Sequence, residues 1–119
     1  MSNCPTDFLD NAVAQCAIGT EMTSRNCISR AYYAAYHLST QKWVPIKDNN
    51  AAGRHAKYIH QLLASPDNSP ERKVGVKLKV LYSRRLKADY SLEDDLTVLE
   101  AQLQLVTTKE LFSIVQAVV

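Results

Sequence analysis

The segment 78–90 combines a buried helical pattern with a charge that such a pattern should exclude. Apolar residues recur here every three or four positions, the period of one face of an α-helix. The positions on this face are Val74, Leu78, Leu81, Arg85 and Ala88. Because a guanidinium stays charged and is costly to bury alone, Arg85 needs a partner on the core side, and Asp89 one turn later is the nearest carboxylate. The pair would either fix helix packing or form part of a functional site.

Helical periodicity also accounts for the rest of the chain, and no strand pattern competes with it. Breakers and capping residues divide the sequence into segments joined by short loops. The predicted helices run from an N-cap at Thr6 and Asp7 to Gly19, over 21–43, 51–64 and 70–88 with Ser69 as N-cap, and onward from a capping box at Ser91 to Asp94. The apolar positions of the last helix are Leu96, Leu99, Leu103, Val106, Ile114 and Val118. We expect an all-α, up-and-down bundle of about five helices forming a single domain over residues 1–119, with the second helix at its centre.

Composition limits the function classes. The net charge is only +2, which is too small for a general nucleic-acid coat protein, so contacts to a polyanion must come from local clusters of charge. The odd set of three cysteines, Cys4, Cys16 and Cys27, fits a reducing cytoplasm, and we expect them to fill the core. No apolar run is long enough to cross a membrane, and the first residues lack the basic and apolar regions typical of a leader, so we expect neither export nor a membrane span. The sequence therefore predicts a cytoplasmic protein.

Arg30, Tyr33 and His37 fall on one face of the second predicted helix, at spacings of three and four. An imidazole can transfer a proton, a guanidinium can hold a phosphate, and a phenol can hydrogen-bond to either. These groups could activate a ribose 2′-hydroxyl without a metal. Alternatively, the tyrosine and histidine pack into the bundle with their polar tips hydrogen-bonded.

The other histidines give no catalytic or metal-binding pattern. Arg54 and His60 are six positions apart, which places them on opposing sides of a helix, and His55 is expected to help close the bundle. The spacing of five between His55 and His60 does not suit two metal ligands on one face. We expect no metal site and no cofactor.

A basic stripe borders the apolar face of the fourth predicted helix. Its members are Lys73, Lys77, Arg84 and Lys87. The stripe would either contact the phosphates of RNA or form a solvated surface whose long side chains cover the edge of the core.

Two motifs resemble those of HEPN domains, small helical bundles found in prokaryotic toxins, defence systems and nucleotidyltransferase operons. Leu78 to Tyr90 is similar to an L-x-x-L-Y-x-x-R-x-x-A-D-Y signature, and Arg30 to His37 is similar to R-x-Y-Y-A-x-x-H. The resemblance implies a metal-independent endoribonuclease of a toxin–antitoxin or defence system. In such an enzyme Arg85 would anchor a phosphate and Asp89 would orient it. Arg30 and His37 would hold and protonate the scissile phosphodiester, with Tyr90 as a phenolic donor or a target of modification.

The sequence departs from the HEPN ribonuclease pattern after Arg85. A histidine follows the arginine in active members, whereas Asp89 and Tyr90 stand at these positions here. His37 would have to supply the imidazole from the second helix. The alternative is a catalytically silent HEPN module that binds protein, nucleotide or nucleic acid in a larger assembly.

The resemblance also implies partners, namely RNA, a nucleotidyltransferase antitoxin and a second copy of the chain. A homodimer would bring helices two and four of both copies together around one cleft. Three tyrosines on the second predicted helix, Tyr32, Tyr33 and Tyr36, favour this arrangement, because buried phenols need hydrogen-bond partners and aromatic residues are enriched in interface cores. The alternative is that all three pack inside one bundle.

Overall fold

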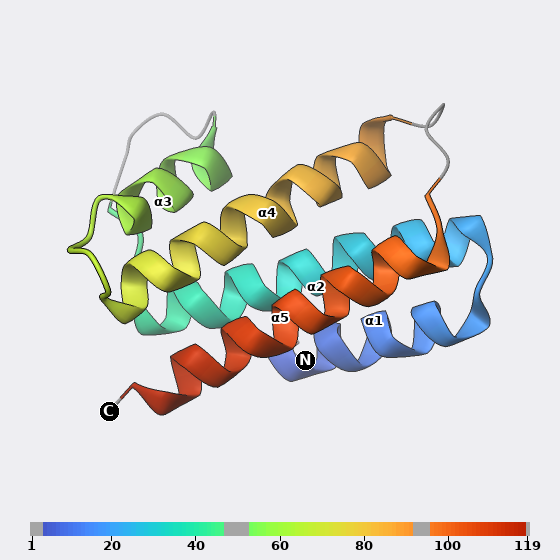
Figure 1. The fold of residues 1–119 in the computed structure, drawn as a ribbon, viewed down its shortest axis with the longest axis horizontal. Helices are drawn as coiled ribbons and strands as arrows, with labels where there is room; N and C mark the ends of the chain where they lie inside the picture. Colours follow the sequence, from blue (N-terminus) through green and yellow to red (C-terminus); the bar gives the residue numbers. More distant parts are fainter. Residues whose placement is uncertain (1–3, 47–52, 92–95, 119) are drawn as a thin grey trace.

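Five α-helices make up most of the residues described by the computed structural model, which are 4–46, 53–91 and 96–118 (Figure 1). The helices are α1 (Pro5–Ile18), α2 (Glu21–Lys42), α3 (Arg54–Leu63), α4 (Pro70–Tyr90) and α5 (Val98–Ala117). No strand occurs within these residues, and the predicted all-α fold is confirmed.

The helix starts show which capping signals the chain uses. Ser69 caps α4 as predicted, since its Oγ accepts a hydrogen bond from the Arg72 N–H at 3.2 Å. The predicted N-cap of α1 at Thr6 and Asp7 is wrong. Cys4 occupies the cap, Pro5 is the first helical residue, and the Asp7 carboxylate accepts from the Cys4 N–H at 3.1 Å. Proline suits this first position because its missing N–H would have no helical partner there.

The last helix begins later than the sequence suggested. Thr97 is the N-cap of α5, and its Oγ1 accepts from the Glu100 N–H at 3.3 Å. Ser91, predicted to open a capping box, instead ends α4, with its N–H donating to the Lys87 carbonyl. The remainder of the predicted box, at 92–94, lies outside the described residues, as do the first two residues of the predicted 51–64 helix.

α2 is the central helix, as predicted. It packs against α1, α4 and α5, while α3 packs against α4 (Figure 1). The α3–α4 contact is close because Gly75 faces α3: a Cβ at this position would lie 2.9 Å from Leu62 Cβ and 3.2 Å from the Leu63 backbone nitrogen. A larger residue at Gly75 would push α3 away from α4.

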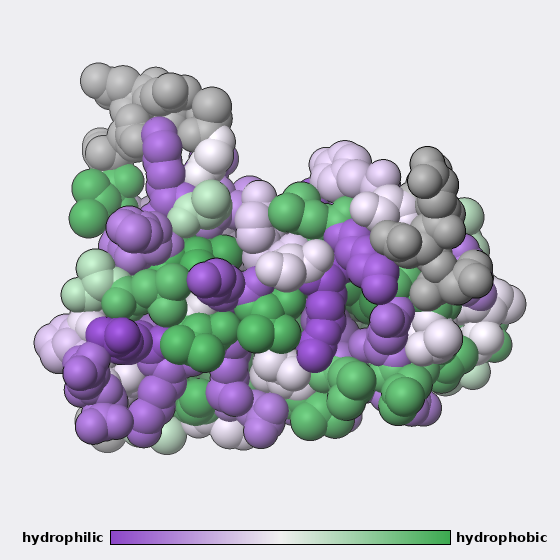
Figure 2. Space-filling model, turned by 45° about the horizontal axis from the view of Figure 1, so that its top comes forward, coloured by the Kyte–Doolittle hydropathy of each residue, from purple (hydrophilic) through white to green (hydrophobic). Residues whose placement is uncertain are grey.

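The buried face of α5 follows only part of the predicted apolar row: Leu96 is buried just before the helix and Ile114 packs against the core, but the positions between them do not. Leu99, Leu103 and Val106 are 62%, 46% and 55% exposed. The row that faces the core is Ala101, Gln104, Leu105, Thr108, Leu111, Phe112 and Val115. Both rows have helical spacing, so periodicity alone could not separate them. Figure 2 shows hydrophobic surface interrupted by hydrophilic residues over the face to which α4 and α5 contribute.

Gln104 explains why a polar residue lies in that buried row. Its side chain is fully buried, and its Nε2 donates to the carbonyls of Ile28 at 3.2 Å and Leu81 at 3.0 Å. Its Oε1 accepts from Arg84 at 3.3 Å. One amide thus connects α5 to α2 and α4, and its polar atoms are satisfied.

The cysteines only partly follow the prediction that they fill the core. Cys16 and Cys27 are buried, whereas Cys4 is exposed. Burial, and to a smaller extent the neighbouring Cys16, raises the pKa of the Cys27 thiol to about 12. None of the described helices is both long and apolar enough to span a membrane.

Candidate functional site

Arg85 and Asp89 form the predicted ion pair on α4. The Arg85 side chain is 12% exposed, and its Nε lies 2.9 Å from Asp89 Oδ2. The Nε–H is not aligned with this oxygen and makes no hydrogen bond, so the contact is an ion pair. Ser29 Oγ on α2 donates to the same carboxylate oxygen at 3.4 Å. Asp89 is therefore fixed from two helices.

Two tyrosine rings flank the Arg85 guanidinium. Its Nη2 donates to Tyr33 Oη at 2.8 Å, and its Cζ lies 5.3 Å from the Tyr33 ring centroid and 5.6 Å from that of Tyr90. Burial lowers the pKa of Arg85, but Tyr33, Asp89 and Tyr90 outweigh burial and raise it overall. Tyr90 is 70% exposed. The result is a permanent cation held between one half-buried ring and one ring open to solvent.

The guanidinium keeps an unused donor. Asp89 and Tyr33 engage Nε and Nη2, while Nη1 makes no hydrogen bond to any residue in the described ranges. Because Arg binds phosphate and carboxylate through paired donors, this free edge is suited to an anion.

His55 lies at the centre of an aromatic cluster beside this arginine. Its Nδ1 is 2.7 Å from the hydroxyl oxygen of Tyr32. The centroid of its ring is 4.3 Å from that of Tyr36 and 6.0 Å from that of Tyr82, on which it stacks with an interplanar angle of 9°. Burial lowers the pKa of His55, and the nearby Arg85, Arg54 and His37 lower it further. Burial is also the main cause that raises the pKa of Tyr32. The pair therefore stays uncharged at neutral pH.

Sequence reasoning gave His55 only a role in closing the bundle. It does join α3 to α2, but it also lines a hollow of about 310 Å³ with Gly53, Arg54 and Tyr82. No local spacing could reveal this position, since Tyr32 is 23 residues away in the sequence. Arg54, set aside together with His60, contributes a cation to the lining of this hollow.

His37 and Arg85 both contact Tyr33, although they come from different helices. The centroid of the His37 ring is 6.2 Å from that of Tyr33. The same ring stacks on Phe8 of α1, with the centroids 5.4 Å apart and an interplanar angle of 24°. His37 itself is exposed. The imidazole and the arginine, whose relation the sequence could not give, thus lie against the same tyrosine ring, at 6.2 Å and 5.3 Å from its centroid.

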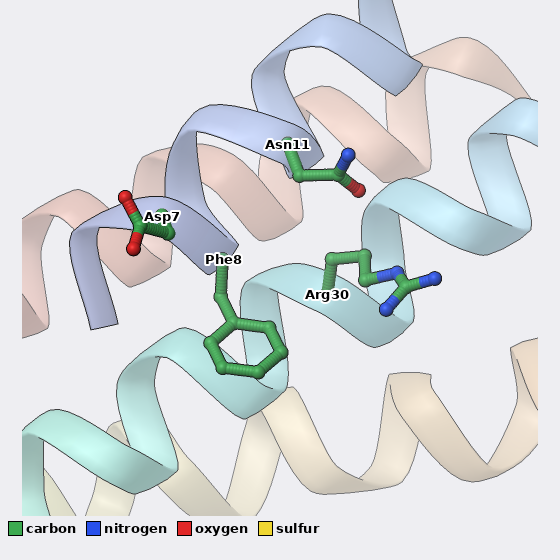
Figure 3. A pocket seen from close by; sticks show the side chains of 4 residues that line it. All are labelled: Asp7, Phe8, Asn11 and Arg30. Carbon is green, nitrogen blue, oxygen red and sulfur yellow. The ribbon is translucent and has the colours of Figure 1, made fainter. Parts of the chain in front are cut away.

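Arg30, the third member of the predicted face, lies at a separate hollow. This hollow has a volume of about 230 Å³ and is lined by Asp7, Phe8, Asn11 and Arg30 (Figure 3). Phe8 also contacts His37 and Tyr33. The two hollows are thus linked through a continuous set of rings.

The basic stripe of α4 has partners on α5. Lys77 Nζ lies 3.6 Å from Glu110 Oε1, and Lys87 Nζ lies 3.5 Å from Glu100 Oε1. Arg84 Nη1 donates to Gln104 Oε1 at 3.3 Å and to Thr107 Oγ1 at 3.5 Å. Lys73 is exposed. These contacts favour the structural interpretation of the stripe over phosphate binding, since three of its four members already connect α4 to α5.

The tyrosines of α2 find partners inside one chain. Tyr32 and Tyr36 are 0% and 8% exposed, and the hydroxyls of Tyr32 and Tyr33 are bonded to His55 and Arg85. A second copy of the chain is not needed to satisfy these two hydroxyls. Across the described ranges, no group of three or more His, Cys, Asp or Glu side chains is placed to hold a metal ion.

The neutral state of His55 predicts a pH dependence of stability. A histidine whose folded pKa is lowered binds fewer protons than in the unfolded chain, where the pKa is about 6.5. Its contribution to the free energy of unfolding is complete above that pH and is lost as the pH falls below it. Denaturant titrations between about pH 8 and pH 5 should show a steeper decline for wild type than for His55→Gln. His60→Gln, at an exposed position of the same helix, is the matched control, and equal slopes for all three proteins would contradict this assignment.

A scan against protein-family models and searches of curated proteins and of solved structures found no match to this chain. The resemblance to HEPN domains therefore rests on the two sequence motifs.

Proposed function

We propose that the protein binds RNA on the surface formed by Arg85, Tyr33, Tyr90 and His55, called here the Arg85 face. The observation that carries the proposal is the state of Arg85, a nearly buried cation that is held by Asp89 and Tyr33 and still has a free Nη1. A phosphate can bind this free edge, and an unpaired base can stack on the exposed ring of Tyr90. Both parts of a nucleotide thus have a complementary surface.

We propose further that the bound RNA is cleaved without a metal, as in the HEPN toxins and defence ribonucleases that the motifs resemble. A base removes the proton of a ribose 2′-hydroxyl, its oxygen bonds to the adjacent phosphorus, and the bond from phosphorus to the 5′-oxygen breaks as that oxygen gains a proton. His37 is the candidate for proton transfer because it is exposed and contacts the same tyrosine as Arg85. Arg85 would stabilise the extra charge on the phosphorane.

The second candidate is a silent HEPN-like module that binds without cleaving. Its supporting observation is that Asp89, one of the residues standing where the resemblance implies a catalytic histidine, is engaged by Arg85 and Ser29. In either case, a homodimer, a nucleotidyltransferase antitoxin as partner and a cytoplasmic location are proposals that rest on the resemblance.

Binding is tested with a fluorescently labelled single-stranded RNA, by anisotropy at low salt. Arg85→Lys keeps the charge but loses the fork of donors, and it should weaken binding at least about tenfold, because a charge-assisted hydrogen bond contributes about 1.5–3 kcal/mol. Lys109→Ala, at an exposed site on α5, is a charge control and should bind like wild type.

Lys73→Ala combined with Lys77→Ala tests the basic stripe of α4. If the slope of log affinity against log salt falls by about 0.7 per replaced residue, the phosphates bind the stripe instead of the Arg85 face.

Cleavage is tested by incubating total RNA with wild type and His37→Ala in EDTA. Products from wild type that are lost in the variant would support the ribonuclease. Intact RNA together with binding that depends on Arg85 would support the silent module. RNA binding that is unmeasurable at low salt would contradict the ribonuclease and a silent module that binds RNA, and would leave only a silent module whose ligand is not RNA.

A further inference from the structure

We propose that the hollow between α1 and α2, lined by Asp7, Phe8, Asn11 and Arg30, is a second subsite for the same ligand (Figure 3). It would take the nucleotide adjacent to the one held at the Arg85 face, so that the ligand is an unpaired strand of at least two nucleotides. This inference rests on the proposed function and adds to it a second point of contact, on a different pair of helices.

Arg30 supplies the cation of this subsite. Its side chain is exposed, and it forms no ion pair or hydrogen bond with the residues in the described ranges. Its donors are therefore free to bind a phosphate. The nearby carboxylate of Asp7 is turned toward the N-terminus of α1, where Oδ2 accepts from the Cys4 N–H at 3.1 Å, and Figure 3 shows it on the side of Phe8 away from Arg30.

Phe8 and Asn11 supply the surface for a base. Phe8 extends from α1 toward α2, and Asn11, one turn further along α1, extends its amide toward Arg30 (Figure 3). A phenyl ring can stack on any base, and an amide offers both donors and an acceptor to a base edge. The volume of about 230 Å³ is smaller than the roughly 300 Å³ at which pockets for complete small ligands begin. The hollow therefore suits one segment of a longer ligand.

The rings of the two sites are continuous. Phe8 lies 6.4 Å from Tyr33, measured between ring centroids, and Arg85 lies over the Tyr33 ring at 5.3 Å. A strand that leaves the Arg85 face across Tyr33 thus reaches Phe8 and then Arg30. The exposed His37, stacked on Phe8, borders this path between the two cations.

The test compares competitors of different length against labelled single-stranded RNA. With wild type, an unlabelled dinucleotide should compete about tenfold better than the mononucleotide, because the second base adds a stack and a phosphate contact. Arg30→Ala should bring this ratio close to one while leaving the affinity for the mononucleotide unchanged. Phe8→Leu should also reduce the ratio, with its melting temperature recorded because Phe8 packs against the core. Lys109→Ala should retain the wild-type ratio.

The outcomes separate this inference from the proposed function. A mononucleotide that competes and is weakened by Arg85→Lys, together with a ratio unaffected by Arg30→Ala, would overturn the second subsite and leave the Arg85 face intact. If neither labelled RNA nor any competitor binds, the proposed function fails and the subsite with it. Because Arg30 is exposed, Arg30→Ala is expected to fold, and its result decides the question.

Discussion

Replacing Arg25 with methionine is expected to lower the free energy of unfolding by about 3–5 kcal/mol. Arg25 is only 6% exposed, and its Nη1 donates to the carbonyl of Ala88 at 2.9 Å, with longer contacts of 3.4 Å to those of Lys87 and Ser91. The last carbonyls of a helix have no partner within it and carry partial negative charge. One buried guanidinium thus caps the C-terminus of α4 from α2.

The size of the effect follows from what methionine leaves behind. It fills a similar volume but donates no hydrogen bond, so carbonyls at a buried helix end lose a charged donor. Because α4 carries Asp89 and Tyr90 in its last turn, loosening of this end should also weaken RNA binding.

Denaturant unfolding followed by far-UV circular dichroism measures the loss. Glu21→Gln is the control, since Glu21 pairs with Arg25 Nε at 3.2 Å but is 51% exposed, and surface ion pairs contribute at most about 1 kcal/mol. If Arg25→Met unfolds at the same denaturant concentration as Glu21→Gln, the cap does not stabilise α4.

The contrast between Arg25 and Arg85 shows what the sequence could and could not predict. Arg85 stands in an apolar row with a carboxylate one turn away, so both its burial and its partner follow from helical spacing. The Nη1 acceptors of Arg25 are backbone carbonyls 62 to 66 residues away, which no side-chain pattern reveals. The bond between Tyr32 and His55 was missed for the same reason.

The fold itself was accessible because its signals are local. Helical period, Pro70 after Ser69 and the glycine after α1 mark segments without reference to the rest of the chain. Which face of a helix is buried depends on its neighbours. For this reason the prediction that Leu99, Leu103 and Val106 mark the buried face of α5 is wrong. Their row is apolar, but the core side is defined by the position of α2 and α4, where Gln104 satisfies carbonyls of both.

The stripe on α4 shows the same limit for charge. A cluster of basic residues with few acidic residues nearby in the sequence suggests a surface that binds phosphate. The acidic residues that pair with this stripe are Glu100 and Glu110, which come close only when α5 packs along α4. Arg85, the residue that the apolar pattern singles out, keeps a free Nη1 instead, and the exposed Arg30 on α2 keeps its donors as well.

Arg85 itself supports the second large prediction. Arg85→Met should lower the free energy of unfolding by about 2–3 kcal/mol, less than the loss for a fully buried pair because Asp89 is 28% exposed and keeps some contact with water. The loss has two parts: Asp89 remains as a charge without its cation, and Tyr33 Oη loses its donor. A double-mutant cycle with Asp89→Asn separates the first part.

In the cycle, adding Asp89→Asn to Arg85→Met should recover part of the stability, since the neutral amide no longer needs a cation and can still bond to Ser29. Asp89→Asn alone should cost less than Arg85→Met, because the remaining guanidinium keeps its hydrogen bond to Tyr33 and its contacts with both tyrosine rings. Additive losses in the double variant would mean that the two side chains do not interact energetically despite the 2.9 Å separation of Nε and Oδ2. If the double variant is as stable as expected yet fails to bind RNA, Arg85 itself holds the ligand. In that case the fold does not need the guanidinium once Asp89 is neutral, whereas RNA binding does.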